Sequence, residues 1–389
     1  MKQLICLSLL LVFLAACSKN EPAITGTPLD EPDLAFSRLV APYLNLEETP
    51  VPFGFPSEND NSKATLGRVL FYDKNLSADG KISCASCHKQ EFAFGDNVAF
   101  SEGVFGGRTE RNSIALGIYP FEPRYGLSDL ANFFDAINFS NQGLFWDKRA
   151  TNLTAQCRAT FANEVEMGMN VYQVLQAAKQ RDFYPWLFEK AFGDPEITEL
   201  RIMQSLSMFL RSMKNNLSRF DQSVKAAGTN DFWSKDFPTF TKEENLGKFL
   251  FTKHCVTCHT TSLNQQVLFT SADNGLEQGE KPDAGIGGHT KKVQDFGVFK
   301  SPPLRNIAVT APYMHDGRFQ TLDEVIEHYN SGIHKNPNLH PILRVSWDSD
   351  ADPIRMNLTE ADKKALKKFL ETLTDWDFLS DEKFKDPFR

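Results

Sequence analysis

Two Cys-x-x-Cys-His motifs, at residues 84–88 (CASCH) and 255–259 (CVTCH), carry the clearest chemical signal in this chain. The spacing sets two thiols about one helical turn apart, where both can add to the vinyl groups of one haem, and places the adjacent histidine under the iron. The motifs therefore predict two covalently bound c-type haems. The thioether cysteines would be Cys84, Cys87, Cys255 and Cys258, and the proximal iron ligands would be His88 and His259.

A single motif of this kind also occurs in redox dithiols and as half of a zinc site. Zinc would need four ligands at each site, and neither motif has a companion cysteine pair. Of the remaining cysteines, Cys6 and Cys17 lie in the N-terminal leader, and we interpret Cys157 as a small buried apolar side chain. Two motifs in one exported chain favour haem over both alternatives.

The segments that must position the two motifs resemble each other. Residues 62–88 and 241–259 each contain Leu-Gly, a basic residue and a Leu-Phe pair ahead of the motif, which we interpret as an internal duplication. Apolar residues recur at helical spacing in 197–220, and capping patterns at Thr241 and Thr359 predict two further helices. Strand patterns are sparse. The predicted fold is mainly α, with two cytochrome c-like haem domains.

Residues 1–17 have the pattern of a secretion leader, in which Lys2 precedes an apolar run too short to span a bilayer. The leader ends in Leu14-Ala-Ala-Cys17, which resembles a bacterial lipobox; an ordinary signal cleaved near Cys17 is the alternative. We predict a periplasmic protein that is lipidated at Cys17 and attached to the membrane by this lipid anchor only. Ser18 stands where an Asp would retain the chain in the inner membrane, which favours the outer membrane.

Length, composition and charge limit the class of protein and the kind of partner that fit this chain. A chain of 389 residues with 41% hydrophobic and 24% charged residues is typical of globular proteins, not of disordered or polytopic membrane chains. The formal net charge of −8 argues against nucleic acid and favours a basic partner. We expect a flexible tether at 18–34, an N-terminal domain at 35–225 and a C-terminal domain at 226–389.

A second iron ligand opposite the proximal histidine distinguishes the two kinds of haem. A haem with ligands on both faces transfers electrons, whereas a haem with one open face can be catalytic. Segment 89–145, which we expect to fold over the first haem, contains neither His nor Met, and around Val104 it offers only Phe105, Gly106 and Gly107. We therefore expect the first iron to have an open face. The second domain offers several candidate ligands, namely Met314, His315, His328, Tyr329, His334 and His340.

Beyond the haem motifs, the sequence resembles the bacterial di-haem cytochrome c peroxidase family, which includes MauG-type enzymes, over about residues 60–375. The matching strings are Arg111-Asn112-Ser113, GLFWDKR at 143–149, NEVEM at 163–167, Leu304-Arg305-Asn306 and TAPYMHDG at 310–317. The resemblance implies that Glu166 is the acid–base catalyst beside the first haem and that Trp146 relays electrons between the haems. It also implies a calcium ion held by Asn112 and the backbone carbonyls of Thr310 and Pro312.

Without the resemblance, Glu166 could equally be a carboxylate on the protein surface, and Trp146 could equally be a side chain of the apolar core.

Two departures from the family pattern stand out. Typical members place a distal histidine near the position of Val104, and this chain has none. Typical members place a methionine on the second iron 14 residues after the histidine that corresponds to His315, where this chain has Tyr329, a MauG-like arrangement. His328 and Met314 remain alternative ligands.

The resemblance implies an oxidoreductase of the cytochrome-c peroxidase type. It would reduce hydrogen peroxide to water at the N-terminal, peroxidatic haem, with electrons passing through the C-terminal haem from a small cytochrome c or another periplasmic donor. One alternative is a MauG-like oxidase that modifies a partner protein through a bis-ferryl state. An alternative from another class is a non-catalytic electron-transfer cytochrome. A homodimer is a further hypothesis, on which the sequence carries no signal.

Overall fold

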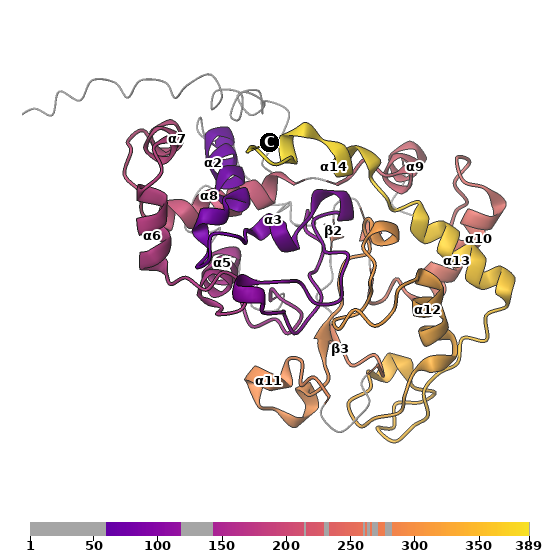
Figure 1. Cartoon of the computed structure of the whole chain (residues 1–389). Coiled ribbons are helices and arrows are strands. Elements are labelled where there is room, and N and C mark those ends of the chain that lie inside the picture. Colours follow the sequence, from indigo (N-terminus) through magenta and orange to yellow (C-terminus); the bar gives the residue numbers. More distant parts are fainter. Residues whose placement is uncertain are drawn as a thin grey trace, which may run out of the picture.

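The structure, a computed structural model, describes residues 60–117, 143–213, 215–228, 233–259, 261–262, 265–266, 271–276 and 282–388. The leader, the tether and Cys17 lie outside these residues. Helices dominate the described chain (Figure 1), which confirms the mainly α fold. Strands occur there as two short antiparallel pairs, β1 (Thr261–Ser262) with β2 (Gln265–Gln266) and β3 (Ser271–Ala272) with β4 (Phe299–Lys300). Within the described residues, no helix combines the length and apolarity needed to span a membrane.

The helices fall into two groups that follow each other along the chain (Figure 1). The first comprises α2 (Asp60–Tyr72), α3 (Cys84–Cys87), α5 (Leu153–Ala162), α6 (Val171–Lys179), α7 (Phe183–Phe192) and α8 (Glu199–Ser212), with the short turns η3 (Lys74–Leu76), η4 (Gln90–Phe92) and η5 (Val104–Gly106). The second comprises α9 (Arg219–Ala227), α10 (Lys242–His254), α11 (Gly287–Thr290), α12 (Leu322–Glu327), α13 (Glu360–Glu371) and α14 (Trp376–Ser380), with the turns η7 (Val293–Asp295), η8 (Ile307–Val309), η9 (His328–Gly332), η10 (Pro341–Leu343) and η11 (Glu382–Phe384).

The duplicated segments occupy equivalent places in the two groups. The first copy forms α2, which crosses α8, and the second forms α10, which crosses α13. At each crossing the helices meet at the glycine of the Leu-Gly pair, because a Cβ at Gly67 would overlap the carbonyl oxygen of Ser205, and one at Gly247 would overlap that of Ala365. The Leu-Phe pair of the first copy packs in the first apolar core, and that of the second copy packs in the second core. Phe71 packs edge-on against Phe209, and Phe251 packs against Phe369 with its ring tilted.

Capping side chains start the helices where the sequence predicted them. Thr241 accepts a hydrogen bond from the backbone of Glu244 at the start of α10, and Thr359 accepts one from Asp362 at the start of α13. The predicted helix at 197–220 is shorter than expected. It ends at Ser212 as α8, because Ser218 caps a new helix, α9.

The two apolar cores divide the chain differently from the predicted boundary at residue 225. That residue lies inside α9, whose Phe220 and Val224 pack in the second core, so this core begins at the start of α9. The C-terminal segment then returns to the first core, where Phe378 and Phe384 pack. Figure 1 shows α14 and the C-terminus close to α2. The boundary between the cores differs from the predicted one for two reasons. The apolar face of α9 packs in the second core, and the aromatic pair at the C-terminus packs in the first.

The close helix crossing predicts a specific sensitivity to added volume. Replacing Gly247 with Ala should lower the free energy of unfolding by about 1–3 kcal/mol, because α10 must move away from the backbone of α13. Thermal denaturation followed by circular dichroism measures the effect. Gly288→Ala is the matched control, since a Cβ there meets only the Cβ of Ala284, at 3.5 Å. Equal melting temperatures for the two variants would contradict this packing.

Candidate functional site: two cavities at the Cys-x-x-Cys-His motifs

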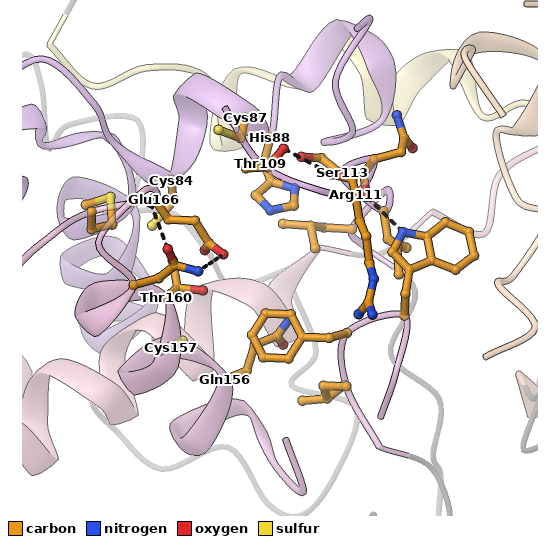
Figure 2. Close-up of a pocket in the computed structure, with 18 of the residues that line it drawn as sticks. Cys84, Cys87, His88, Thr109, Arg111, Ser113, Gln156, Cys157, Thr160 and Glu166 are labelled. Carbon is orange, nitrogen blue, oxygen red and sulfur yellow. Dashed lines mark hydrogen bonds between the residues drawn. The ribbon is translucent and has the colours of Figure 1, made fainter. Parts of the chain in front are cut away.

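The first Cys-x-x-Cys-His motif lines a cavity of about 660 Å³, a volume within the range of cofactor sites. The motif cysteines lie on the single turn of α3, which is held at its start by a hydrogen bond from the backbone of Ser83 to the hydroxyl of Ser86 (3.0 Å). Cys84, Cys87 and His88 face the same space as Glu166 (Figure 2). The structure therefore brings the predicted haem-attachment residues and the predicted acid–base residue together.

Each predicted proximal histidine is oriented through one ring nitrogen. Nδ1 of His88 lies 2.6 Å from the carbonyl oxygen of Phe94, and Nδ1 of His259 lies 2.9 Å from that of Pro302. Burial lowers the pKa of His88 and lowers that of His259 to about 4. Both rings are therefore neutral near pH 7. A donor Nδ1–H leaves Nε2 as the free lone pair, which is the form of imidazole that binds a metal.

The cysteines suit attachment to an apolar cofactor. Burial raises the pKa of Cys87 to about 11 and that of Cys255 to about 12, as expected for thiols in apolar surroundings. No group of three or more His, Cys, Asp or Glu side chains able to hold a metal ion occurs in the part of the chain that the structure describes. These residues fit a haem at each motif better than they fit zinc.

Glu166 is held in place by Asn163. The Nδ2 atom of Asn163 donates to Oε1 of Glu166 (2.9 Å), while its Oδ1 accepts from the backbone nitrogens of Val165 (2.9 Å) and Glu166 (3.2 Å). Burial raises the pKa of Glu166, against the opposing effects of a hydrogen bond from Thr160 and the charge of Arg149. A positioned carboxyl with a raised pKa is suited both to accept and to release a proton.

The segment expected to cover the first haem packs against the Glu166 loop. The backbone nitrogen of Val104 donates to the carbonyl oxygen of Val165 (2.9 Å), and a Cβ at Gly103 would overlap that same oxygen. Among the described residues that line the first cavity, His88 is the one histidine and Met167 the one methionine. Part of segment 89–145, residues 118–142, lies outside the described residues.

Trp146 lies in the wall that the two cavities share. Its side chain lines both cavities, its Nε1 donates to the carbonyl oxygen of Asn112 (2.8 Å), and its own carbonyl accepts from the backbone of Lys300 (2.8 Å). On its far side the ring of His315 stands edge-on at 6.3 Å and stacks on Phe299 at 3.8 Å. An aromatic bridge therefore separates the two cavities.

The three predicted calcium-binding residues come together at the second cavity, where Asn112, Thr310 and Pro312 all contribute to the lining. Asn112 is buried, and its Nδ2 donates to the carbonyl oxygen of Val98 (3.1 Å). The bond through Nδ2 leaves the side-chain oxygen of Asn112 as an acceptor, and amide and backbone carbonyl oxygens are donors of the type that calcium prefers.

The second motif lines a smaller cavity, of about 280 Å³, together with Tyr329 and Met314. After α12 the chain continues as the π-helical turn η9, which carries Tyr329 into the cavity. The Nδ2 atom of Asn274 donates to the phenol oxygen of Tyr329 (3.2 Å) and to the sulfur of Met314 (3.8 Å). Burial raises the pKa of Tyr329 to about 12. His328 does not line the cavity, because its Nε2 is bound to the carbonyl oxygen of Asn274 (3.1 Å).

Several functional contacts had no signal in the sequence. Asn163 lies in the matching string at 163–167, but the string alone does not show that it orients Glu166, and Asn274, which contacts Tyr329, belongs to no motif. Arg111 belongs to a matching string, but its partners could not be predicted. It binds Asp147 next to Trp146 (2.7 Å) and makes a bidentate pair with Asp283, 172 residues away (2.7 and 2.8 Å). Only the folded chain brings these groups together.

Comparison with known proteins identifies the family of this chain. A family model described as di-haem cytochrome c peroxidase matches residues 61–229. The chain is 30% identical over 361 residues to the methylamine utilization protein MauG of Paracoccus denitrificans, covering 81% of this chain and 89% of that protein. It is also 30% identical over 272 residues to the cytochrome c551 peroxidase of Nitrosomonas europaea, covering 68% and 71% respectively. Among solved structures, a MauG-like protein associated with microbial copper homeostasis aligns with a TM-score of 0.68 and 29% identity, covering 86% of this chain and 96% of that one.

The ion pairs of Arg111 predict a pH-dependent contribution to stability. Burial alone would raise the pKa values of Asp147 and Asp283, but the hydrogen bonds and charge of Arg111 outweigh it and lower both. The contribution should be complete above about pH 4 and should be lost as the pH falls through the lowered pKa values. Arg111→Met should cost about 1–3 kcal/mol of unfolding free energy at pH 7, because it leaves the buried Asp147 short of a partner.

Denaturant titrations at pH 7 and at pH 3 measure this difference. Arg149→Met is the control, since Arg149 also contacts Asp147 but its side chain is 38% exposed, and we expect its loss to cost less than about 1 kcal/mol. A cost for Arg111→Met that stays the same at pH 3 would contradict the electrostatic origin.

Proposed function

Because this chain belongs to the di-haem cytochrome c peroxidase family, which includes MauG, we propose that it reduces hydrogen peroxide to water in the cavity of His88 and Glu166. Two c-type haems are the cofactors that this family implies. In the proposed reaction one peroxide molecule takes up two electrons and two protons and yields two water molecules. The electrons would reach the first cavity through the haem of the second, from a small cytochrome c.

The observation that carries this proposal is the position of Glu166. Its carboxyl group lines the same cavity as Cys84, Cys87 and His88, with a raised pKa and a fixed hydrogen bond from Asn163. An electron-transfer cytochrome needs no such group beside its iron. The absence of a second histidine among the described lining residues also supports an open face for the peroxide.

A haem held by His88 would supply the iron that binds the peroxide and the electrons that reduce it. The carboxylate of Glu166 would take the proton from one peroxide oxygen and return it to the other, so that water leaves as the O–O bond breaks. Asn163 would keep Oε1 of Glu166 directed at the cavity during both transfers. Trp146, in the shared wall, would carry electrons between the cavities.

For the second cavity we propose Tyr329 as the ligand opposite His259, supported by its place in the lining and by the engagement of His328 elsewhere. A phenolate ligand would lower the reduction potential of that haem. We also propose calcium at Asn112, Thr310 and Pro312, where it would brace the wall that holds Trp146. The proposed setting is the periplasm, with Cys17 lipidated and the N- and C-terminal domains acting as the peroxidatic and electron-transfer units.

Tyr329 also favours a second candidate function. A tyrosine ligand is the MauG-like arrangement, and the chain aligns with MauG over 89% of that protein's length. In this candidate the electrons come from a side chain of a partner protein instead of a cytochrome. Steady-state peroxide consumption with reduced cytochrome c as the donor separates the two. Rapid turnover supports the peroxidase, whereas peroxide-dependent oxidation of a partner without cytochrome turnover supports the MauG-like oxidase.

Replacing Glu166 with Gln should slow peroxide reduction by about 10²- to 10⁴-fold, because the amide cannot accept the peroxide proton. In the native protein the rate should fall as the pH drops through the raised pKa of Glu166, above the usual carboxyl value of about 4.3. This acid limb should vanish in the variant. Stopped-flow mixing with peroxide over a pH series measures both effects.

Glu164→Gln is the matched control, since this neighbouring carboxylate is exposed and does not line the cavity. Its peroxide kinetics should equal those of the native protein. Native kinetics in Glu166→Gln would remove Glu166 from the mechanism. A resting ferric spectrum without a high-spin component, unchanged by peroxide, would instead favour the electron-transfer cytochrome.

Replacing Tyr329 with Phe should change the absorption and electron paramagnetic resonance spectra of one haem and leave the other unaffected, because the variant removes the proposed ligand oxygen. Tyr313→Phe is the control. Tyr313 lines the same cavity, but its hydroxyl donates to the carbonyl oxygen of Ile307 (2.9 Å). An unchanged spectrum in Tyr329→Phe would point to Met314.

A further inference from the structure

Lys300 has an unusual position for a lysine. It ends the short strand β4 and lines both cavities, in the same wall as Trp146. Its backbone nitrogen donates to the carbonyl oxygen of Trp146 (2.8 Å), which fixes the start of its side chain relative to the aromatic bridge. Among the described residues lining the first cavity, the second domain contributes Lys300, Ser301 and Pro303, so Lys300 is the charged group that it sends there.

The ammonium group of Lys300 has no hydrogen-bond or ion-pair partner among the described residues. The carboxylates at this wall, Asp147 and Asp283, are engaged by Arg111, and Asp147 also by Arg149. Burial lowers the pKa of Lys300 to about 8, and the positive charge of Lys148 lowers it further in the same direction. A partly buried cation of this kind is costly unless an anion pairs with it.

We propose that Lys300 is the counter-ion of a haem propionate at the wall between the two cavities. The inference rests on the proposed function in one respect, since it requires haem in the cavities that Lys300 lines. A c-type haem carries two propionate carboxylates. Either carboxylate is an anion that could form an ion pair with the ammonium group of Lys300. Either haem could supply the carboxylate, because Lys300 faces both cavities.

The pairing makes Lys300 a positioning residue. Its side chain would hold a haem edge while its backbone holds Trp146, so that one residue fixes the distance between the haem and the proposed electron relay. It would also act on the iron through charge. A positive charge close to the haem disfavours the ferric state relative to the ferrous state, so its removal should lower the reduction potential of the haem that it contacts.

The test is a spectroelectrochemical titration of the two haems in Lys300→Met, in the full-length protein with its haems attached. At a fixed potential near the native midpoint, the ratio of oxidised to reduced haem should rise about tenfold for at least one haem, equivalent to 59 mV for a one-electron couple. The haem whose ratio changes is the one that supplies the carboxylate. Lys300→Arg keeps the charge and should shift the ratio much less.

Lys148→Met is the matched control, because it removes an equal charge close to Lys300 from a side chain that lines neither cavity. Unchanged potentials of both haems in Lys300→Met, or equal shifts in Lys148→Met, would overturn the pairing. Should Lys300→Met fail to retain haem, Lys300→Gln provides the same loss of charge with a polar side chain. A haem count of two per chain and native peroxide reduction, measured on the unmodified protein, keep a failure of this inference separate from a failure of the proposed function.

Discussion

The wall between the two cavities is the constraint on which the rest of the structure depends. It is built from segments far apart in the chain, and two hydrogen bonds join them, one from Trp146 to Asn112 and one from Lys300 to Trp146. Each cavity uses this wall as one of its sides, so neither is complete without both domains. Arg111 reinforces the same place by bridging Asp147 and Asp283 across the interface. The separation of the two cavities is therefore set by hydrogen bonds and ion pairs within a single chain.

The duplication explains how one scaffold serves two different sites. Both copies bury the same glycine contact between crossing helices and the same phenylalanine pair, so the frame around each motif is preserved. The difference lies in the segments that follow the motif. In the first domain the loop at Asn163 brings a carboxyl into the cavity, and in the second the π-helical turn brings a phenol. A carboxyl that exchanges protons suits bond cleavage, whereas a phenol suits ligation of the iron.

The sequence predicted those parts of the molecule that are encoded locally. The haem motifs, the duplicated helices and the caps at Thr241 and Thr359 each occupy a short stretch with its own spacing rule. The resemblance to a known family extended this to Glu166, Trp146 and Tyr329, all of which line the expected cavities. The groups that orient them could not be predicted. Asn274 meets Tyr329 across 55 residues and Arg111 meets Asp283 across 172, and no pattern in either segment specifies the other.

The return of the C-terminal segment to the first core ties the second half of the chain to the first cavity. The side chain of Gln90, close to the first haem motif, donates to the carbonyl oxygens of Phe378 (3.1 Å) and Asp381 (2.9 Å). The ring of Phe378 packs at a tilt against Phe94, whose own carbonyl orients His88. The C-terminal segment thus supports the proximal side of the first cavity, while Lys300 and Trp146 form its wall toward the second. Because a segment from the second half of the chain acts on two sides of the first cavity, the domains cannot rotate apart without disturbing the histidine that would hold the iron. An interface of this kind would suit the proposed transfer of electrons between the two cavities.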